Sequence, residues 1–250
     1  ITDRPLEVNL REIREVKRKY PKHVVIASLM VESKEDWRDI IKRCIDAGAD
    51  GLELNFGCPH GMCERGMGSA VGQEPEVLKV VAGWAVEYST VPVLVKLTPN
   101  VGDIRVPGVA AVQAGAHGLS LINTIKSIVG VDLDKMVPYP VVGNRSTNGG
   151  YCGPAVKPIA LHMVSSLGRD PRVNVPISGI GGIATWRDAA EFIAMGCTSV
   201  QVCTAVMHHG YRIVEDMIEG LSEYLDKSGM KSVGELRGRA TPAYQEWGDL

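Results

Sequence analysis

The sequence predicts an α/β protein built as a (β/α)8 TIM barrel, of which this chain supplies strands three to eight. Three observations predict this fold. Apolar runs suited to buried parallel strands alternate with segments of helical pattern. Glycine repeatedly stands where a helix should end and a strand should follow. Glycine-rich turns come after the last two strands, where barrels of this type frequently bind phosphate.

The glycine pattern recurs in "AGADGLEL" (47–54), "AGAHGLSL" (114–121) and "MGCTSVQV" (195–202). Glycine tolerates the left-handed conformation that closes helices, so each segment is interpreted as a helix end, a glycine cap and a short strand. Three further apolar runs are predicted as strands: "HVVIASLM" (23–30), "VPVLVKL" (91–97) and "NVPISGI" (174–180). Such runs suit a sheet that is buried on both faces.

Helices are predicted between these strands. Ser33 with Asp36 and Thr185 with Asp188 have the spacing of capping boxes, and Pro75 suits the first turn of a helix. The predicted helices span about 34–47, 75–89, 105–115, 156–168, 186–195 and 209–228. The opening "ITDRPLEVNLREI" contains no obvious starting element. The expected organisation is a barrel over residues 1–228, followed by a C-terminal helix and tail over residues 229–250.

Six strands that alternate with helices indicate a parallel sheet, because parallel neighbours need crossover connections. An open doubly wound sheet would usually carry a glycine-rich dinucleotide turn after its first strand, and "SLMVES" has no such turn. If "SGIGGI" (178–183) and "VCTAV" (202–206) follow strands seven and eight, the first two βα units are missing from this chain. The start without methionine fits this interpretation, so the chain is expected to be a fragment.

Composition limits the classes of function. The 250 residues are 45% hydrophobic and 22% charged, with a formal net charge of −2 and a pI near 6.3, so no basic footprint for nucleic acid is present. No apolar run is long enough for a membrane span and no signal peptide opens the chain, so a cytoplasmic protein without a membrane partner is expected. The six cysteines are too sparse for a disulfide scaffold. The spacing of Cys58 and Cys63 does not continue into an iron–sulfur or zinc pattern, and no metal site is expected.

Two long connections are expected at the same end of the sheet. Residues 55–74 follow the second visible strand, and residues 125–155 follow the strand that ends in "LINT". Both exceed the usual length of a βα connection, and such length usually indicates function. Two glycine-rich loops on one rim could form a lid over a site.

Cys58 begins the first of these loops, near His60 and Arg65, where a thiol could exchange a proton with a bound substrate. A small buried hydrophobic residue is an equally good interpretation of its position. Lys96 closes an otherwise apolar barrel strand, so its side chain is expected to point into the mouth of the barrel. A lysine that only extends its amine to solvent is the alternative.

Asn55, Asn123 and Thr124 also end strands, where they could hydrogen-bond a flat polar ligand. Capping and turn roles are comparably good interpretations for each of them alone. Gly181 and Gly182 leave backbone N–H groups open to an anion before a helix, which is the usual arrangement for phosphate binding. Their place after the penultimate strand strengthens this otherwise weak signal.

Several motifs taken together resemble a known family. The segments "ELNFGCPHGMCERGMG", "VKLTPNV", "SLINT", "GGYCGPAVKPIAL", "SGIGGI" and "QVCTAV" are similar, in order and through nearly the whole chain, to the flavin-containing pyrimidine-reducing domain of dihydropyrimidine dehydrogenases, especially the bacterial NAD-dependent type. The related dihydroorotate dehydrogenases share the barrel, but they typically have "CPN" where this chain has "CPH".

The resemblance implies FMN as the cofactor and reduction of the C5–C6 double bond of uracil or thymine. It implies that Cys58 is the general acid that protonates C5 while hydride passes from flavin N5 to C6. The substrate-binding residues that it implies are Asn55, Asn123 and Thr124. The implied cofactor-binding residues are Lys96 at the flavin N1/C2 edge, and Gly153, Gly181, Gly182, Cys203 and Thr204 at the phosphate.

The chain departs from the family pattern at Cys63, where relatives more often have glycine or serine, and at Gly57, where many have serine. Further flavin contacts and another substrate-binding asparagine of the family lie in the first barrel strands, outside this chain. The family's iron–sulfur clusters and its FAD and NAD(P)H sites are likewise expected only on a missing segment or a partner subunit. An electron-transfer partner and a homo- or hetero-oligomer are therefore expected.

Two alternatives to pyrimidine reduction remain. One is a dihydroorotate dehydrogenase, which uses the same barrel. The other is a non-catalytic truncated barrel, because an incomplete barrel exposes strand edges that normally pair.

Overall fold

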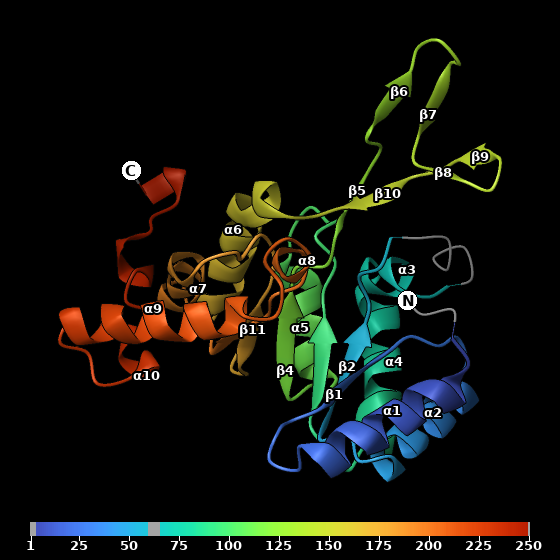
Figure 1. Ribbon diagram of the computed structural model, residues 1–250, viewed down its shortest axis with the longest axis horizontal. Helices are drawn as coiled ribbons and strands as arrows, with labels where there is room; N and C mark the ends of the chain where they lie inside the picture. The colour runs from blue at the N-terminus through green and yellow to red at the C-terminus, as the bar shows by residue number, and fades with distance from the viewer. Residues whose placement is uncertain (1–3, 60–65, 250) are drawn as a thin grey trace.

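The computed structural model describes residues 4–59 and 66–249. Its centre is one six-stranded sheet (Figure 1). In spatial order its strands are β1 (Ile26–Leu29), β2 (Gly51–Asn55), β3 (Val93–Lys96), β4 (Gly118–Leu121), β11 (Ile177–Gly179) and β12 (Ser199–Val200). All neighbouring strands pair in parallel. The predicted strands and their parallel direction are confirmed, although β1, β3 and β11 are shorter than the apolar runs that predicted them.

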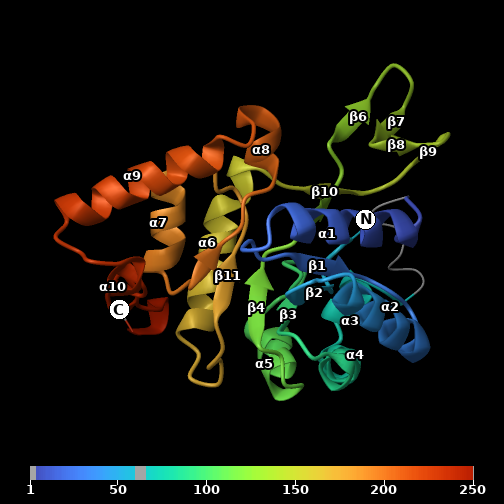
Figure 2. The ribbon, with the colours of Figure 1, turned by 60° about the horizontal axis from the view of Figure 1, so that its bottom comes forward.

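A layer of helices surrounds the sheet (Figure 2). It consists of α2 (Lys34–Asp46), α4 (Pro75–Tyr88), α5 (Arg105–Gln113), α6 (Lys157–Gly168), α7 (Trp186–Ala194) and α9 (Ile213–Lys227). Each of these helices contacts the next one along the chain, as in the outer ring of a (β/α) barrel. The sheet is thus part of a barrel, as the sequence predicts.

The local signals that predicted two helix starts are present in the structure. Ser33 and Thr185 each accept a hydrogen bond from the backbone N–H three residues later, and the aspartate there bonds back, so both capping boxes form. Pro75 occupies the first turn of α4, where its missing N–H has no intrahelical partner to lose.

Alternation along the strands separates the core from the barrel interior. Leu52 and Leu54 of β2 are fully buried in the main hydrophobic cluster with residues of the surrounding helices. Glu53 and Asn55 point to the opposite face, because successive side chains of a strand alternate. In register, Asn55 pairs with Lys96, which pairs in turn with Ser120 of β4. A polar row therefore crosses the interior face of an otherwise apolar sheet.

Two short departures from the expected helices occur. The opening segment, for which no element was expected, forms α1 (Leu6–Lys19), whose Leu10 is packed into the main hydrophobic cluster; the spacing of its apolar residues was the overlooked signal. The helix expected at 209–228 is confirmed as α9, which begins at Ile213, and a separate helix that was not expected, α8 (Thr204–His209), precedes it. Gly210, at φ 72°, lies between them and ends α8.

The C-terminal segment is attached to the helical layer. Its helix α10 (Val233–Leu236) buries Leu236 in a second hydrophobic cluster with Ile193 and Leu225. Two 3-10 turns follow, η3 (Thr241–Ala243) and η4 (Trp247–Asp249). Arg169 bonds Glu246 over 2.7 Å and lies over the ring of Tyr244. The division at residues 228 and 229 stays a prediction.

The two long connections contain more structure than glycine-rich loops. Residues 55–74 include the short helix α3 (Ser69–Gly72). Residues 125–151, here called the arm, form three antiparallel pairs, which were not predicted from the sequence. The pairs are β5 (Ile125–Ser127) with β10 (Gly149–Tyr151), β6 (Gly130–Asp132) with β7 (Val137–Tyr139), and β8 (Val141–Val142) with β9 (Arg145–Ser146). Figure 1 shows β6 to β9 projecting away from the sheet, while β5 and β10 stay beside it.

The described residues contain neither a candidate membrane span nor a candidate metal cluster. No helix in residues 4–59 or 66–249 combines the length and the apolar character that a membrane crossing requires. In the same residues, no group of three or more His, Cys, Asp or Glu side chains is arranged to hold a metal ion.

Candidate active site

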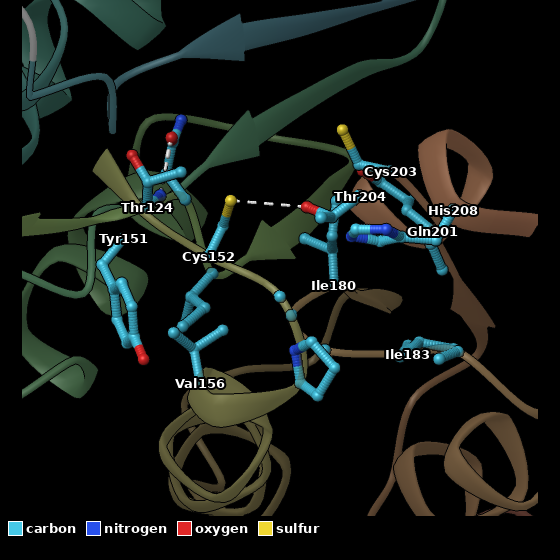
Figure 3. A pocket seen from close by; sticks show the side chains of 18 of the residues that line it. Thr124, Tyr151, Cys152, Val156, Ile180, Ile183, Gln201, Cys203, Thr204 and His208 are labelled. Atoms are coloured by element: carbon cyan, nitrogen blue, oxygen red, sulfur yellow. Dashed lines mark hydrogen bonds between the residues drawn. The ribbon is translucent and has the colours of Figure 1, made fainter. Parts of the chain in front are cut away.

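A cavity of about 280 Å³ lies at the carboxyl ends of the barrel strands, between the arm and α8 (Figure 3). This is the end of a (β/α) barrel at which catalytic loops gather. The structure brings together every predicted site residue except Cys58. The predicted residues that line the cavity are Asn55, Lys96, Asn123, Thr124, Gly153, Gly181, Gly182, Cys203 and Thr204.

One side of the cavity is formed by strand ends that hold amide and hydroxyl groups. Asn55 Oδ1 accepts hydrogen bonds from Asn123 Nδ2 over 2.9 Å and from the backbone N–H of Cys58 over 3.1 Å. Asn123 Oδ1 in turn accepts from the backbone N–H of Thr124 over 2.8 Å. These bonds fix the orientation of both asparagine amides, because each oxygen faces a donor.

The hydroxyl of Thr124 is buried and has no hydrogen-bond partner within the described part of the chain. Buried polar atoms are normally paired, because an unpaired one costs roughly 1–3 kcal/mol. Thr124 also lines the cavity. A polar ligand in the cavity would supply the missing partner.

Lys96 lies at the floor of the cavity. Its Nζ is 3.2 Å from Glu53 Oε1 and donates to Gln201 Oε1 over 3.1 Å. Both side chains of the Lys96–Glu53 pair are largely buried. The predicted alternative, a lysine that extends its amine into solvent, is therefore wrong. The side chain is instead held by two neighbouring residues of the barrel interior.

Three glycines of the cavity wall have positive φ: Gly153 at 89°, Gly181 at 136° and Gly182 at 74°. A β-carbon added to Gly182 would lie 2.9 Å from the carbonyl oxygen of Gly153 and 2.8 Å from Cβ of Lys157. The two loops thus approach at a distance that only glycine permits. Thr204 begins α8 beside them, and its hydroxyl donates to Cys152 Sγ over 3.4 Å.

Cys58 lies beside the cavity and does not line it. Its side chain is buried, with 7% of the residue exposed, and its carbonyl oxygen accepts a hydrogen bond from Ser69. Gly68 has φ 59°, and a β-carbon there would lie 2.7 Å from that carbonyl oxygen. The predicted neighbours His60 and Arg65, and also Cys63, lie outside the described residues. The catalytic role of Cys58 stays a prediction.

The remaining described cysteines divide into two groups. Cys44 and Cys197 are buried, and burial raises the pKa of both thiols, that of Cys197 to about 12. Neither is suited to proton exchange near neutral pH. Cys152 and Cys203 are exposed and line the cavity.

Sequence reasoning missed several cavity residues. Gln201 is a polar residue at the end of the last strand, the same signal that identified Lys96. Glu53 does not line the cavity but contacts Lys96, which does; as a charged residue inside an apolar strand it has a pattern that indicates an interior partner. Ser28, Tyr151 and Cys152 carry no comparable signal. His208 and His209, at the end of α8, also line the cavity.

Comparison with known proteins finds relatives named dihydroorotate dehydrogenase and dihydropyrimidine dehydrogenase. The family model described as dihydroorotate dehydrogenase matches residues 3–225. The chain is 46% identical over 241 residues to the NAD-dependent dihydropyrimidine dehydrogenase subunit PreA of Escherichia coli, covering 96% of this chain and 58% of that protein. It is 42% identical over 255 residues to the chloroplastic dihydropyrimidine dehydrogenase (NADP(+)) of Arabidopsis thaliana, covering 100% of this chain and 60% of that protein.

The chain thus spans about three fifths of the length of these relatives. Among solved structures, it is similar to dihydroorotate dehydrogenase of Eimeria tenella, crystallised with ferulenol. The TM-score is 0.71 at 21% sequence identity, covering 94% of this chain and 66% of that one. At this identity the likeness concerns the barrel fold.

Proposed function

The chain belongs to the dihydroorotate dehydrogenase family, and from this membership we propose that it is the FMN- and pyrimidine-binding part of a dihydropyrimidine dehydrogenase. The proposed reaction is reduction of the C5–C6 double bond of uracil or thymine. The observation that carries the proposal is the set of oriented amides, Asn55 and Asn123, next to the unpaired buried hydroxyl of Thr124. Amide and hydroxyl groups complement the alternating N–H and C=O groups of a pyrimidine ring.

The cavity suits FMN at both of its ends. Glycine at position 182 lets its loop lie against Gly153 and Lys157, and Gly181, Cys203 and Thr204 complete that wall of the cavity. These five residues would hold the phosphate through backbone N–H groups and the threonine hydroxyl. Lys96, at the floor, would contact the ring. Bound FMN would supply the hydride for C6 of the pyrimidine.

In this proposal Cys58 donates its thiol proton to C5 of the pyrimidine, and the electron pair of the C5–C6 double bond forms the new C–H bond there. Asn55 and Asn123 hold the ring, and Thr124 bonds one of its polar edges. Because Cys58 does not line the cavity in the described arrangement, the proposal requires the Cys58 side chain to turn toward the bound ring.

The charge of the cavity favours uracil or thymine over dihydroorotate. Dihydroorotate carries a carboxylate, which normally requires a cationic partner in a buried site. Among the described residues that line the cavity, Lys96 is the only lysine or arginine, and it is already held by Glu53 and Gln201. Oxidation of dihydroorotate stays the second candidate, because the family model carries that name.

We further propose that electrons reach the site from NAD(P)H through a partner subunit or a further segment that holds FAD and iron–sulfur clusters. The support is that the Escherichia coli relative is named an NAD-dependent subunit. A homo- or hetero-oligomer is the expected assembly.

The test is anaerobic reoxidation of the flavin. The protein is expressed from its complete coding sequence, purified and reduced photochemically, and the return of flavin absorbance is followed after addition of uracil, thymine or orotate. Reoxidation by uracil or thymine supports the proposal. Reoxidation by orotate alone supports the second candidate, and a protein that binds no FMN contradicts both.

A further inference from the structure

Glu53 is a buried carboxylate that the proposed reaction does not use. It lies in the middle of β2, on the interior face of the sheet, and only 8% of the residue is exposed. Removing a carboxylate from water costs several kcal/mol unless other groups pair with it. Its surroundings therefore have to compensate for that burial.

Every partner of the Glu53 carboxylate lies on the floor of the cavity or in the adjoining strands. Oε1 faces Lys96 Nζ at 3.2 Å. Oε2 accepts from the hydroxyl of Ser120 over 2.8 Å and from Nε2 of Gln201 over 2.9 Å. Nε2 of Gln201 also lies 3.3 Å from Oγ of Ser178. The carboxylate therefore connects four strands or strand ends of the barrel around one lysine.

Gln201 closes this arrangement into a ring. Its amide nitrogen donates to Glu53, and its amide oxygen accepts from Lys96 over 3.1 Å. The two ends of one amide thus face opposite partners, so its orientation is set by the network. Lys96 has three N–H donors, and two of them are used by Glu53 and Gln201. The third is available to a ligand in the cavity, which Lys96 lines.

The contacts among Glu53, Lys96 and Gln201 also determine the net charge at the floor of the cavity. The carboxylate of Glu53 lies next to the ammonium group of Lys96. A ligand above them therefore experiences the combined electric field of one negative and one positive charge. At short range and in a poorly hydrated site, one added or removed charge changes such a field strongly. Gln201 is neutral and isosteric with glutamate, and Glu53 is isosteric with glutamine.

We propose that Glu53 is a positioning residue that fixes Nζ of Lys96 beneath the bound ring, and that the Glu53–Gln201 pair sets the reduction potential of the FMN. The inference rests on the proposed function, because it needs FMN in the cavity. It gives the buried carboxylate of Glu53 a role in the site, although Glu53 does not touch the ligand. The charges of the side chains at positions 53 and 201 then determine the reduction potential of the FMN.

Three variants test the inference with changes of charge and almost no change of volume. Glu53→Gln removes the negative charge, Gln201→Glu adds one, and the double variant exchanges the two groups. The probe is sulfite, which adds reversibly to N5 of oxidised FMN and places negative charge on the N1/C2 edge of the ring. Its dissociation constant is read from flavin absorbance, and the midpoint potential of the FMN is measured on the same samples.

Glu53→Gln should bind sulfite about tenfold more tightly and have a more positive midpoint potential, because the charge of Lys96 is no longer offset. Gln201→Glu should bind sulfite about tenfold more weakly and have a more negative potential. The double variant should lie within about threefold of the native protein. Ser120→Ala removes one hydrogen bond from Glu53 without changing charge, so its sulfite affinity should stay within about threefold.

A merely structural role for Glu53 predicts a different result. In that case both single variants would lose FMN affinity and thermal stability, and sulfite affinity would change in the same direction or not at all. That outcome overturns the inference, while uracil turnover by the native protein would leave the proposed function intact. A native protein that binds no FMN overturns both.

Discussion

The side chain of Asn148, on the arm, donates a hydrogen bond from Nδ2 to the carbonyl oxygen of Pro59 over 3.1 Å. Pro59 directly follows Cys58, so the bond ties the arm to the loop that carries the proposed proton donor. The two segments are 89 residues apart in the sequence. We infer that the arm holds the Cys58 loop at the edge of the cavity.

Asn148→Ala should therefore lower kcat for uracil reduction about fivefold while the protein keeps its FMN, because the Cys58 segment loses a contact worth about 1 kcal/mol. The measurement is steady-state kinetics together with flavin content. Asn144→Ala, in the exposed turn between β8 and β9, is the matched control and should leave kcat unchanged. Equal kcat values for the two variants would contradict the inferred role of Asn148.

The arm also approaches the substrate-binding threonine. A β-carbon added to Gly150 would lie 2.2 Å from Oγ1 of Thr124, which is closer than any real contact. Gly150→Ala should displace the hydroxyl and raise KM for uracil about tenfold, with flavin content unchanged. Gly149→Ala is the control, since its added carbon would lie 3.4 Å from Pro140 and can be accommodated. An unchanged KM in Gly150→Ala would show that Thr124 does not bind the pyrimidine.

Asp170 is expected to stabilise the fold above acidic pH. The hydrogen bonds from Arg172 lower the pKa of the buried Asp170 carboxyl to about 2. A carboxyl whose pKa is lower in the folded state adds stability above its unfolded pKa of roughly 3.9. That stability is lost as the pH falls from about 4 to 2.

Asp170→Asn should therefore lower the free energy of unfolding by about 1 to 2 kcal/mol at pH 7, after allowance for the exposure of the Arg172 side chain. The difference between the two proteins should shrink as the pH approaches 3. Urea unfolding followed by circular dichroism at several pH values measures both quantities. A difference that is constant across this range would contradict the assignment.

Much of the barrel could be predicted because its signals are local. Buried strands such as β3 are continuous apolar runs, and the capping boxes at Ser33 and Thr185 depend on residues three positions apart. Helix α1 was missed because its apolar spacing stands beside many charged residues. The break at Gly210 was missed because a single glycine can also lie within a helix.

The candidate site could be predicted where a polar residue or a glycine-rich turn ends a strand, where the family resemblance adds residues such as Gly153 and Thr204, and where a residue type conflicts with its local pattern. Lys96 at the end of an apolar strand is such a conflict, and so is Glu53, although its significance was overlooked. The contacts of Asn148 with Pro59 and of Gly150 with Thr124 depend on how the arm folds back. No spacing in the sequence indicates them, because the arm forms through antiparallel pairs with short, irregular connections.

The central claim is that Cys58 delivers the proton to C5 of the pyrimidine, and single-turnover kinetics with Cys58→Ala test it most directly. Native and variant proteins are loaded with FMN, reduced anaerobically and mixed with uracil, and the return of flavin absorbance is timed. We predict that the variant keeps its FMN and reoxidises at least about 100-fold more slowly than the native protein. Reoxidation of the variant at the native rate would contradict the account.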